Sequence, residues 1–243
     1  MTPPLVNVTL PVCNEEAQLA ESAHGLAIHL ASQTACRWEI LVADNGSTDR
    51  TWTIAQTLAW EGAGMNSTMV NLRAMHLDVA GRGGALKAAW QSSKAEILSY
   101  MDVDLSTDLK CLPTLLAAIT EQGADLAVGS RLLPDSETTR GWKREVLSRG
   151  YSWLIRRALG LRVRDAQCGF KAIRREAAQV LLPQVQDNGW FFDTELLVLA
   201  QRAGYRVTEV PVHWVDDPGS TVKLLPTIWR DVCGVWRLRR PAG

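Results

Sequence analysis

Two aspartates, Asp102 and Asp104, directly follow an apolar run in the segment "EILSYMDVDLSTD" (96–108). An unpaired carboxylate at the end of a buried strand is costly, so these residues need a reason to be there. Alternate residues of an extended chain point the same way, so we expect both carboxylates, with Val103 between them, to face one ligand. Two such oxygen donors suit Mg²⁺ or Mn²⁺, with water and substrate phosphates completing the shell. The structural alternative is that Asp102 ends the strand and Asp104 begins a turn or caps a helix.

Polar residues follow a second predicted strand as well. "WEILVAD" ends on Asp44, whose carboxylate can accept a hydrogen bond from a ribose or a base. The next residues, "NGSTD", include Gly46 and form a turn that either presents Asp44 or only connects the strand to a capped helix.

The segment "AGRGGALKAA" (80–89) places glycines between a strand and a helix, where a pyrophosphate can approach the backbone. The glycines do not complete a dinucleotide-binding fingerprint, because Leu86 occupies the third glycine position. Arg82 and Lys87 can still contact a diphosphate, and the alternative for each is a solvated surface charge.

Basic residues gather in the second half of the chain. Arg131 follows "AVGS", where its guanidinium can bind a phosphate through two hydrogen bonds. Lys143 and Arg144 follow within "GWKREVLSR", and Lys171 and Lys223 lie farther on. We interpret these residues as a phosphate-binding cluster, although charge clusters are more often solvated faces.

Strand-like and helical patterns alternate along the first half. We expect strands at 6–12, 38–44, 72–79, 96–102 and 124–130, with helices between them. This order predicts an α/β fold with a Rossmann-like, mostly parallel central sheet and helices on both faces. Residues 132–149 are expected to form a long loop. After it we expect a helix at about 149–159, a strand at 169–175, a helix containing "DTELLVLAQRAG", a strand at 205–212 and a terminal helix.

Composition excludes several classes of function. Lysine plus arginine equals aspartate plus glutamate at 26 each, which argues against binding to nucleic acid. The five cysteines are scattered without CxxC spacing, which is typical of reduced thiols in a cytoplasmic protein. No signal peptide or membrane-spanning run is seen, so any membrane contact is expected to be peripheral. An apolar stripe in the tail "VKLLPTIWRDVCGVWRLRR" predicts either core packing or an interfacial helix.

Taken together, the motifs resemble family 2 inverting glycosyltransferases of the GT-A fold. The similarity is strongest to the branch that makes polyprenyl-phosphate or dolichyl-phosphate sugars, and within it to the glucosyl-phosphate synthases. The matching pieces occur in the family's order over nearly the whole chain: "LPVCNEEAQL", "ILVADNGSTDRT", "GRGGALKAAW", "YMDVDLSTD", "AVGSRL", "DAQCGFKAIRREA", "GWFFDTELLVLAQRAGY" and "EVPVHWVD".

The resemblance implies a UDP- or GDP-linked sugar held by Pro11, Asn14, Glu15 and Asp44, with the diphosphate on Mg²⁺ or Mn²⁺ at Asp102 and Asp104. Arg131 would meet phosphate at the reaction centre, and Lys223 matches a family lysine. Some relatives have a glutamine as a further metal ligand where this chain has Ser106.

The expected protein is therefore a single GT-A domain over 1–243, with a nucleotide-sugar-binding half (1–131) and an acceptor-side half (132–243) that ends in an amphipathic helix. The expected reaction is metal-dependent transfer of a hexose to a polyprenyl phosphate at the cytoplasmic face of a membrane. One alternative is a soluble or protein hydroxyl acceptor, with Asp193 or Glu195 as the general base. Another is a nucleotide-sugar-binding protein without turnover.

Overall fold

The computed structural model describes residues 3–64, 69–139, 142–215 and 224–239, and the side chains of 63–64, 142–147 and 224–230 lie outside this description. Its first half contains the following elements: β1 (Leu5–Val12), α1 (Leu19–Ala31), β2 (Arg37–Asn45), α2 (Thr51–Gly64), β3 (Val70–Leu77), α3 (Arg82–Ser92), β4 (Ile97–Met101), the 3-10 turn η1 (Leu109–Cys111), α4 (Leu112–Thr120) and β5 (Leu126–Ser130).

The second half continues with these elements: β6 (Glu137–Thr139), α5 (Trp142–Leu159), β7 (Phe170–Arg174), α6 (Arg175–Leu181), η2 (Leu182–Gln184), α7 (Phe192–Arg202), β8 (Val207–Pro211), β9 (His213–Val215) and α8 (Leu224–Arg239). The strands expected from the sequence are present. Most of their first and last residues differ from the expected ones by one or two positions.

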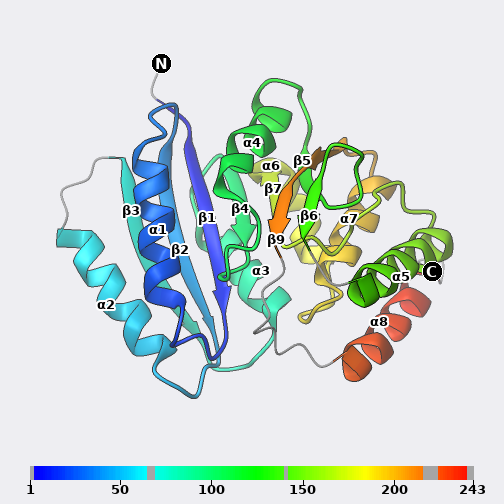
Figure 1. Cartoon of the computed structure of the whole chain (residues 1–243), viewed down its shortest axis with the longest axis horizontal. Coiled ribbons are helices and arrows are strands. Elements are labelled where there is room, and N and C mark those ends of the chain that lie inside the picture. The colour runs from blue at the N-terminus through cyan, green and yellow to red at the C-terminus, as the bar shows by residue number, and fades with distance from the viewer. Residues whose placement is uncertain (1–2, 65–68, 140–141, 216–223, 240–243) are drawn as a thin grey trace.

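The central sheet has seven strands in the order β3-β2-β1-β4-β7-β5-β8 (Figure 1). All neighbouring strands run parallel except β7, which is antiparallel to both β4 and β5. The prediction of a mostly parallel sheet is confirmed. Because β1, β2 and β4 run in one direction, the segments that follow them leave the sheet at the same edge.

Helices cover both faces of this sheet. Along β4, Ile97 and Met101 pack into one apolar cluster with α1 and α4, whereas Leu98 and Tyr100 pack into another with α3, α6 and α7. This alternation follows from the two-residue period of a strand. Figure 1 shows α1 in front of the sheet and α3 behind it. A strand buried on both faces requires the near-continuous apolar sequence from which β4 was predicted.

The expectation of a long loop over 132–149 is wrong in part, because β6 lies at Glu137–Thr139 and α5 begins at Trp142. Pro134 and Gly141, which suggested a loop, both precede the helix. The residues after them include lysine, arginine, glutamate and leucine, which are good helix formers.

In the described part of the chain, no helix is both long and apolar enough to cross a bilayer.

Two glycines offer a matched test of helix packing. A Cβ on Gly83 would lie 2.5 Å from the Cβ of Phe192, because α3 approaches α7 closely there. We expect Gly83→Ala to lower the free energy of unfolding by about 1–3 kcal/mol through overpacking. A Cβ on Gly25 in α1 would have no atom within 4 Å, so Gly25→Ala should raise it by about 0.5–1 kcal/mol. Urea unfolding measures both, and equal effects would contradict the close approach.

Candidate active site

The segments after β1 and β2 are held together by hydrogen bonds between backbone and side chains. The Asn14 N–H donates to Ser47 Oγ at 2.9 Å, and Asn14 Oδ1 accepts from the Thr48 N–H at 2.8 Å. The Glu15 N–H donates to Thr51 Oγ1 at 2.8 Å. Asn14 has a φ of 59°, a left-handed conformation that asparagine tolerates. Pro11 and Glu15 flank this junction. The residues Pro11, Asn14 and Glu15, which were expected to hold the nucleotide sugar, therefore lie together.

Asp44 is fully buried at the end of β2. Its Oδ2 lies 2.6 Å from Nδ1 of His76 on β3, and the His76 ring lies 5.1 Å from that of Trp52. Asp44 Oδ1 is buried with no hydrogen-bond partner among the described residues. A buried oxygen of this kind is costly unless a partner arrives, which is consistent with a ligand N–H or O–H. His76 was not predicted, because nothing in "LRAMHLDV" marks it.

Gly46 forms the turn after Asp44, with a φ of 69°. A Cβ at this position would lie 3.1 Å from the backbone nitrogen of Ala80. Asn45 Oδ1 also accepts a hydrogen bond from the Gly81 N–H. Gly46 therefore allows the loop after β2 to pack on the loop before α3, the role in shaping the turn that the sequence predicted.

The segment Asp102–Asp104 is a turn, which corrects the expectation that it is extended. β4 ends at Met101, and the Leu105 N–H donates to the Asp102 carbonyl at 3.2 Å. Val103 is buried beneath the turn, and Asp104 Oδ1 accepts from the Ser106 N–H at 2.9 Å. The chain must leave the sheet here, so the two-residue period that was assumed does not apply. Both carboxylates still lie at the carboxyl end of β4.

Arg82 links Asp102 to a buried aspartate on α7. Its Nη2 lies 2.7 Å from Asp102 Oδ1, and its Nη1 lies 2.7 Å from Asp193 Oδ2. The guanidinium also lies 5.0 Å from the ring centroid of Trp190 and 4.9 Å from that of Tyr100. Arg82 therefore pairs with two carboxylates of the protein, and the structure does not test its predicted contact with a diphosphate.

Lys171 completes this cluster from β7. Its ammonium lies 2.9 Å from Asp193 Oδ1, 3.0 Å from the Tyr100 hydroxyl and 2.6 Å from the Cys168 carbonyl. The Tyr100 hydroxyl also donates to Asp193. Lysine has three N–H donors, and all three are used, on a side chain that is 2% exposed. The predicted contact between Lys171 and a phosphate is therefore not supported, and the residue stabilises Asp193 instead.

Burial alone would raise the pKa of Asp193, but Lys171 and Arg82 together hold the pKa of this carboxyl below its ordinary value. Burial, reinforced by the negative charge of Asp193, raises the pKa of Tyr100 well above its usual value. Asp193 is therefore ionised and Tyr100 neutral at physiological pH. A carboxylate this acidic and this enclosed is poorly suited to remove a proton from an acceptor.

Glu195, the other candidate base, is also engaged inside the protein. Its Oε2 lies 2.7 Å from Nη2 of Arg237 on α8 and accepts from the Asp187 N–H at 2.7 Å. The side chain is 2% exposed. Glu195 therefore connects α7 to α8 and to the loop before α7.

Arg131 lies at the end of β5 and is held by Asp165. Its Nε and Nη2 lie 2.7 and 3.0 Å from the two carboxylate oxygens, and its guanidinium lies 5.3 Å from the ring centroid of Trp214. Burial opposes ionisation of Asp165, but the Arg131 charge holds the pKa of Asp165 below its usual value. Among the described residues Arg131 Nη1 has no hydrogen-bond partner, which is consistent with the predicted phosphate contact.

Of the remaining predicted cations, Lys87 binds other protein groups, and the side chains of the others lie outside the described residues. The Lys87 ammonium donates to the Val185 carbonyl and to Asn188 Oδ1, at 2.8 and 3.1 Å, so it fastens α3 to the loop before α7. The side chains of Lys143 and Arg144, and the whole of Lys223, lie outside the described residues.

Gly169 is a site residue that sequence reasoning did not single out. A Cβ there would lie 1.7 Å from Asp102 Oδ2, and the Gly169 carbonyl accepts a hydrogen bond from the Asp102 N–H at 3.1 Å. The signal that could have found it is its position directly before β7, whose residue Phe170 pairs with Met101 at the end of β4.

The donor set at this edge fits a divalent cation that is also bound by its substrate. Asp102 is 43% exposed on its side chain, with one oxygen toward Arg82, and Asp104 lies two residues on. No group of three or more His, Cys, Asp or Glu side chains is arranged for a metal in the described part of the chain. Mg²⁺ commonly uses one or two carboxylates with water and phosphate oxygens, so two carboxylates match that chemistry.

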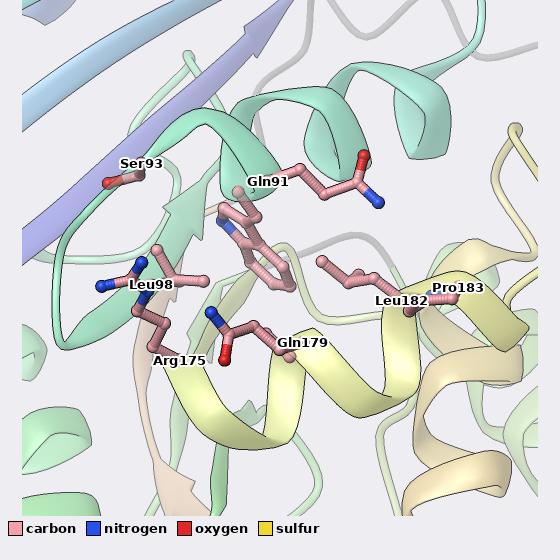
Figure 2. Close-up of a pocket in the computed structure, with 9 residues that line it drawn as sticks. Gln91, Ser93, Leu98, Arg175, Gln179, Leu182 and Pro183 are labelled. Atoms are coloured by element: carbon pink, nitrogen blue, oxygen red, sulfur yellow. The ribbon is translucent and has the colours of Figure 1, made fainter.

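A separate pocket of about 160 Å³ lies between α3 and α6. Figure 2 shows Gln91 on α3 facing Gln179 and Leu182 across it, with Ser93 and Arg175 at one side. Its lining residue Leu98 lies near the amino end of β4, whereas Asp102 follows the carboxyl end. The pocket is therefore not part of the site.

Comparison with known proteins agrees with this geometry. Residues 8–182 match the family model of glycosyl transferase family 2. The chain belongs to glycosyltransferase family 2. It is 40% identical over 232 residues to glycosyltransferase AglD of Haloferax volcanii, covering 95% of this chain but 35% of that protein. It is 29% identical over 257 residues to dolichyl-phosphate beta-glucosyltransferase of Drosophila melanogaster, covering 96% and 77%.

Solved structures show the same fold for this family 2 chain. Glucosyl-3-phosphoglycerate synthase from Mycobacterium tuberculosis, in complex with UDP, superposes with a TM-score of 0.67 at 19% identity, covering 97% of this chain and 80% of that one. Its complex with Mn²⁺ and UDP-glucose gives a TM-score of 0.66 at 20% identity, covering 96% and 78%. The expected GT-A fold is confirmed.

Asp193→Asn removes the charge that balances two buried cations. We expect it to lower the free energy of unfolding by about 3–5 kcal/mol at neutral pH, because buried Lys171 loses its carboxylate and Arg82 keeps only Asp102. The folded pKa of Asp193 is depressed, so its stabilisation is present above the unfolded pKa and is lost as pH falls through the folded value. The gap between wild type and variant should therefore shrink below about pH 4.

Urea unfolding across this pH range measures the gap. Glu121→Gln, an exposed acid at the end of α4, is the control and should change stability by less than about 0.5 kcal/mol. A gap that does not depend on pH would contradict an ionised Asp193.

Gly169→Ala should displace the Asp102 carboxylate, because its new methyl group would overlap Oδ2. Misplacement by about 1 Å can reduce turnover about 100-fold, so we expect a loss of that order in glycosyl transfer. Gly150→Ala is the control, since nothing lies within 4 Å of the added group. Circular dichroism checks folding, and unchanged transfer by folded Gly169→Ala would refute the role of Gly169.

Proposed function

We propose that this chain transfers a hexose, with inversion at the anomeric carbon, from a nucleoside-diphosphate sugar to a polyprenyl phosphate. The observation that carries the proposal is that half-exposed Asp102 follows β4 at the same edge of the sheet as the segments after β1 and β2. Asp44 at the end of β2 has a buried oxygen without a partner among the described residues. UDP-glucose is the first donor to test, because a structural neighbour was solved with UDP-glucose and Mn²⁺.

The donor side of the site supports a nucleotide. Asp44 Oδ1 can accept from a base or a ribose, and the junction of Asn14 with Ser47 and Thr48 fixes the loops around it. Asp102 and Asp104 would hold Mg²⁺ or Mn²⁺, which would neutralise charge on the departing diphosphate. Arg82, which is itself held by Asp193, contacts Asp102 and would keep its carboxylate oriented.

The acceptor side favours a phosphate over a hydroxyl. A hydroxyl must lose a proton during transfer, but Asp193 and Glu195 are buried and ion-paired. A phosphate monoester is already anionic at neutral pH and needs no base. Arg131 is held by Asp165, and its Nη1, which has no partner in the part of the chain that the structure describes, can contact such an anion during transfer. Relatives named dolichyl-phosphate beta-glucosyltransferase support the same acceptor class.

A direct assay tests this function. Radiolabelled UDP-glucose and Mn²⁺ are incubated with the protein and polyprenyl phosphate in detergent, and label is counted in the lipid extract. We expect lipid-bound label that is lost with a chelator. Asp104→Ala should reduce it by about 100-fold or more, because the metal that neutralises the diphosphate would lose a ligand. The control Glu121→Ala should retain wild-type transfer.

The outcomes separate the alternatives. Activity retained by Asp104→Ala would refute the metal assignment. Label found only on a soluble or protein acceptor would refute the lipid acceptor. Donor binding without transfer to any acceptor would identify a nucleotide-sugar-binding protein without turnover.

A further inference from the structure

A second pocket, of about 370 Å³, lies between α5 and two loops of the acceptor side. It is lined by Leu132, Arg149, Ser152, Trp153, Arg156 and Arg164. Four of these residues share one face of α5, at the three- and four-residue spacing of a helix: Arg149, Ser152, Trp153 and Arg156. Its size is within the range of small-molecule sites.

The lining carries three guanidinium groups and no carboxylate. Arg156 Nε is buried and has no hydrogen-bond partner in the described structure. Within the described residues, neither Arg156 nor Arg164 forms an ion pair, in contrast to Arg82 and Arg131. The unpartnered N–H of Arg156 and the unpaired charges of Arg156 and Arg164 among the described residues both favour an anion, and a guanidinium can bind phosphate through two hydrogen bonds.

The pocket adjoins the Arg131–Asp165 pair through the chain itself. Leu132 directly follows Arg131, and Arg164 directly precedes Asp165. The pocket is thus formed by residues next in sequence to this pair, although neither Arg131 nor Asp165 lines it. Trp153, which lines the pocket, is 65% exposed, and the next residue of α5, Leu154, is 53% exposed.

We propose that this pocket binds the phosphate monoester of the acceptor lipid, with Arg156 and Arg164 as its main ligands and the lipid chain leaving over Trp153 and Leu154. The charge argues for a monoester, which carries close to two negative charges at neutral pH, whereas a phospholipid diester carries one. The Ser152 side chain lines the pocket and can add a hydroxyl donor. The identity of the lipid rests on the proposed function; the anion site rests on the pocket alone.

The test is binding without any sugar donor. Neutral phospholipid vesicles with and without a small fraction of polyprenyl phosphate are mixed with the full chain, and bound protein is measured by co-sedimentation. The double variant Arg156→Gln/Arg164→Gln should bind the polyprenyl-phosphate vesicles about tenfold or more weakly, as expected for losing charge-assisted hydrogen bonds.

The matched control is Arg157→Gln/Arg162→Gln. It removes the same charge from the same helix and the following loop, at exposed residues outside the pocket lining. The control should bind within about twofold of wild type, because surface charges contribute little individually. Melting temperatures of both double variants establish that they are folded. Equal losses in the two would overturn the proposal and indicate general electrostatic attraction.

Two further arms identify the source of the phosphate. Inorganic phosphate should compete with the polyprenyl-phosphate vesicles for wild type, and no competition at any concentration would overturn a phosphate site. Vesicles with an anionic phosphodiester lipid should show no dependence on Arg156 and Arg164. A dependence as large as that on polyprenyl phosphate would overturn the monoester assignment.

Transfer assays on the same proteins separate this proposal from the proposed function. If wild type labels polyprenyl phosphate and the pocket variant has an unchanged KM for it, the pocket assignment fails and the function stands. If the pocket variant loses vesicle binding while wild type labels no lipid, the anion site stands and the function fails.

Discussion

The buried carboxylate of Asp193 is the interaction on which the site depends. It lies between the ammonium of Lys171 and the guanidinium of Arg82, and the Tyr100 hydroxyl donates to it as well. These four residues come from α7, β7, α3 and β4, so one charge cluster joins elements from both halves of the chain. Taking such charges out of water is favourable only when geometry and hydrogen bonding are complete. The cluster therefore specifies how these elements pack together. Through Arg82, which contacts both Asp193 and Asp102, it also helps to position the Asp102 carboxylate.

A second constraint is the backbone of the loops after β1 and β2, where the nucleotide sugar is proposed to bind. Asn14 and Gly46 both adopt positive φ values, and the loops that they shape are tied to each other and to the start of α3. A rigid rim of this kind suits recognition of a nucleotide, because a preorganised site loses little entropy when the ligand binds. The acceptor side differs. Arg131 and Arg237 are held in ion pairs there, whereas Arg156 and Arg164 have no such partner among the described residues.

Local sequence patterns were sufficient to predict the sheet, its helices on both faces and the strand ends that carry Asp44, Asp102 and Arg131. They failed where the chain departs from regular geometry: Asp102–Asp104 was assumed to continue the strand, although Leu105 closes a turn there. They also failed for contacts between distant residues. Arg82 and Asp193 are 111 positions apart, so no local pattern reveals that Arg82 is already paired or that Lys171 is buried. His76 and Gly169 carry no motif of their own, and only the strand pairing places them beside the aspartates.

The antiparallel strand β7 has a consequence for how such chains can change over time. Because β7 is inserted between β4 and β5, Gly169 and Lys171 from the later part of the sequence lie against Asp102 and Tyr100 from the earlier part. The two halves share one ionic cluster and one sheet, so neither can be exchanged for the corresponding part of a relative unless the partner charges and the missing side chain at 169 are exchanged with it. Changes at peripheral positions such as α5 are therefore tolerated more readily than replacement of residues 132–243 as a unit.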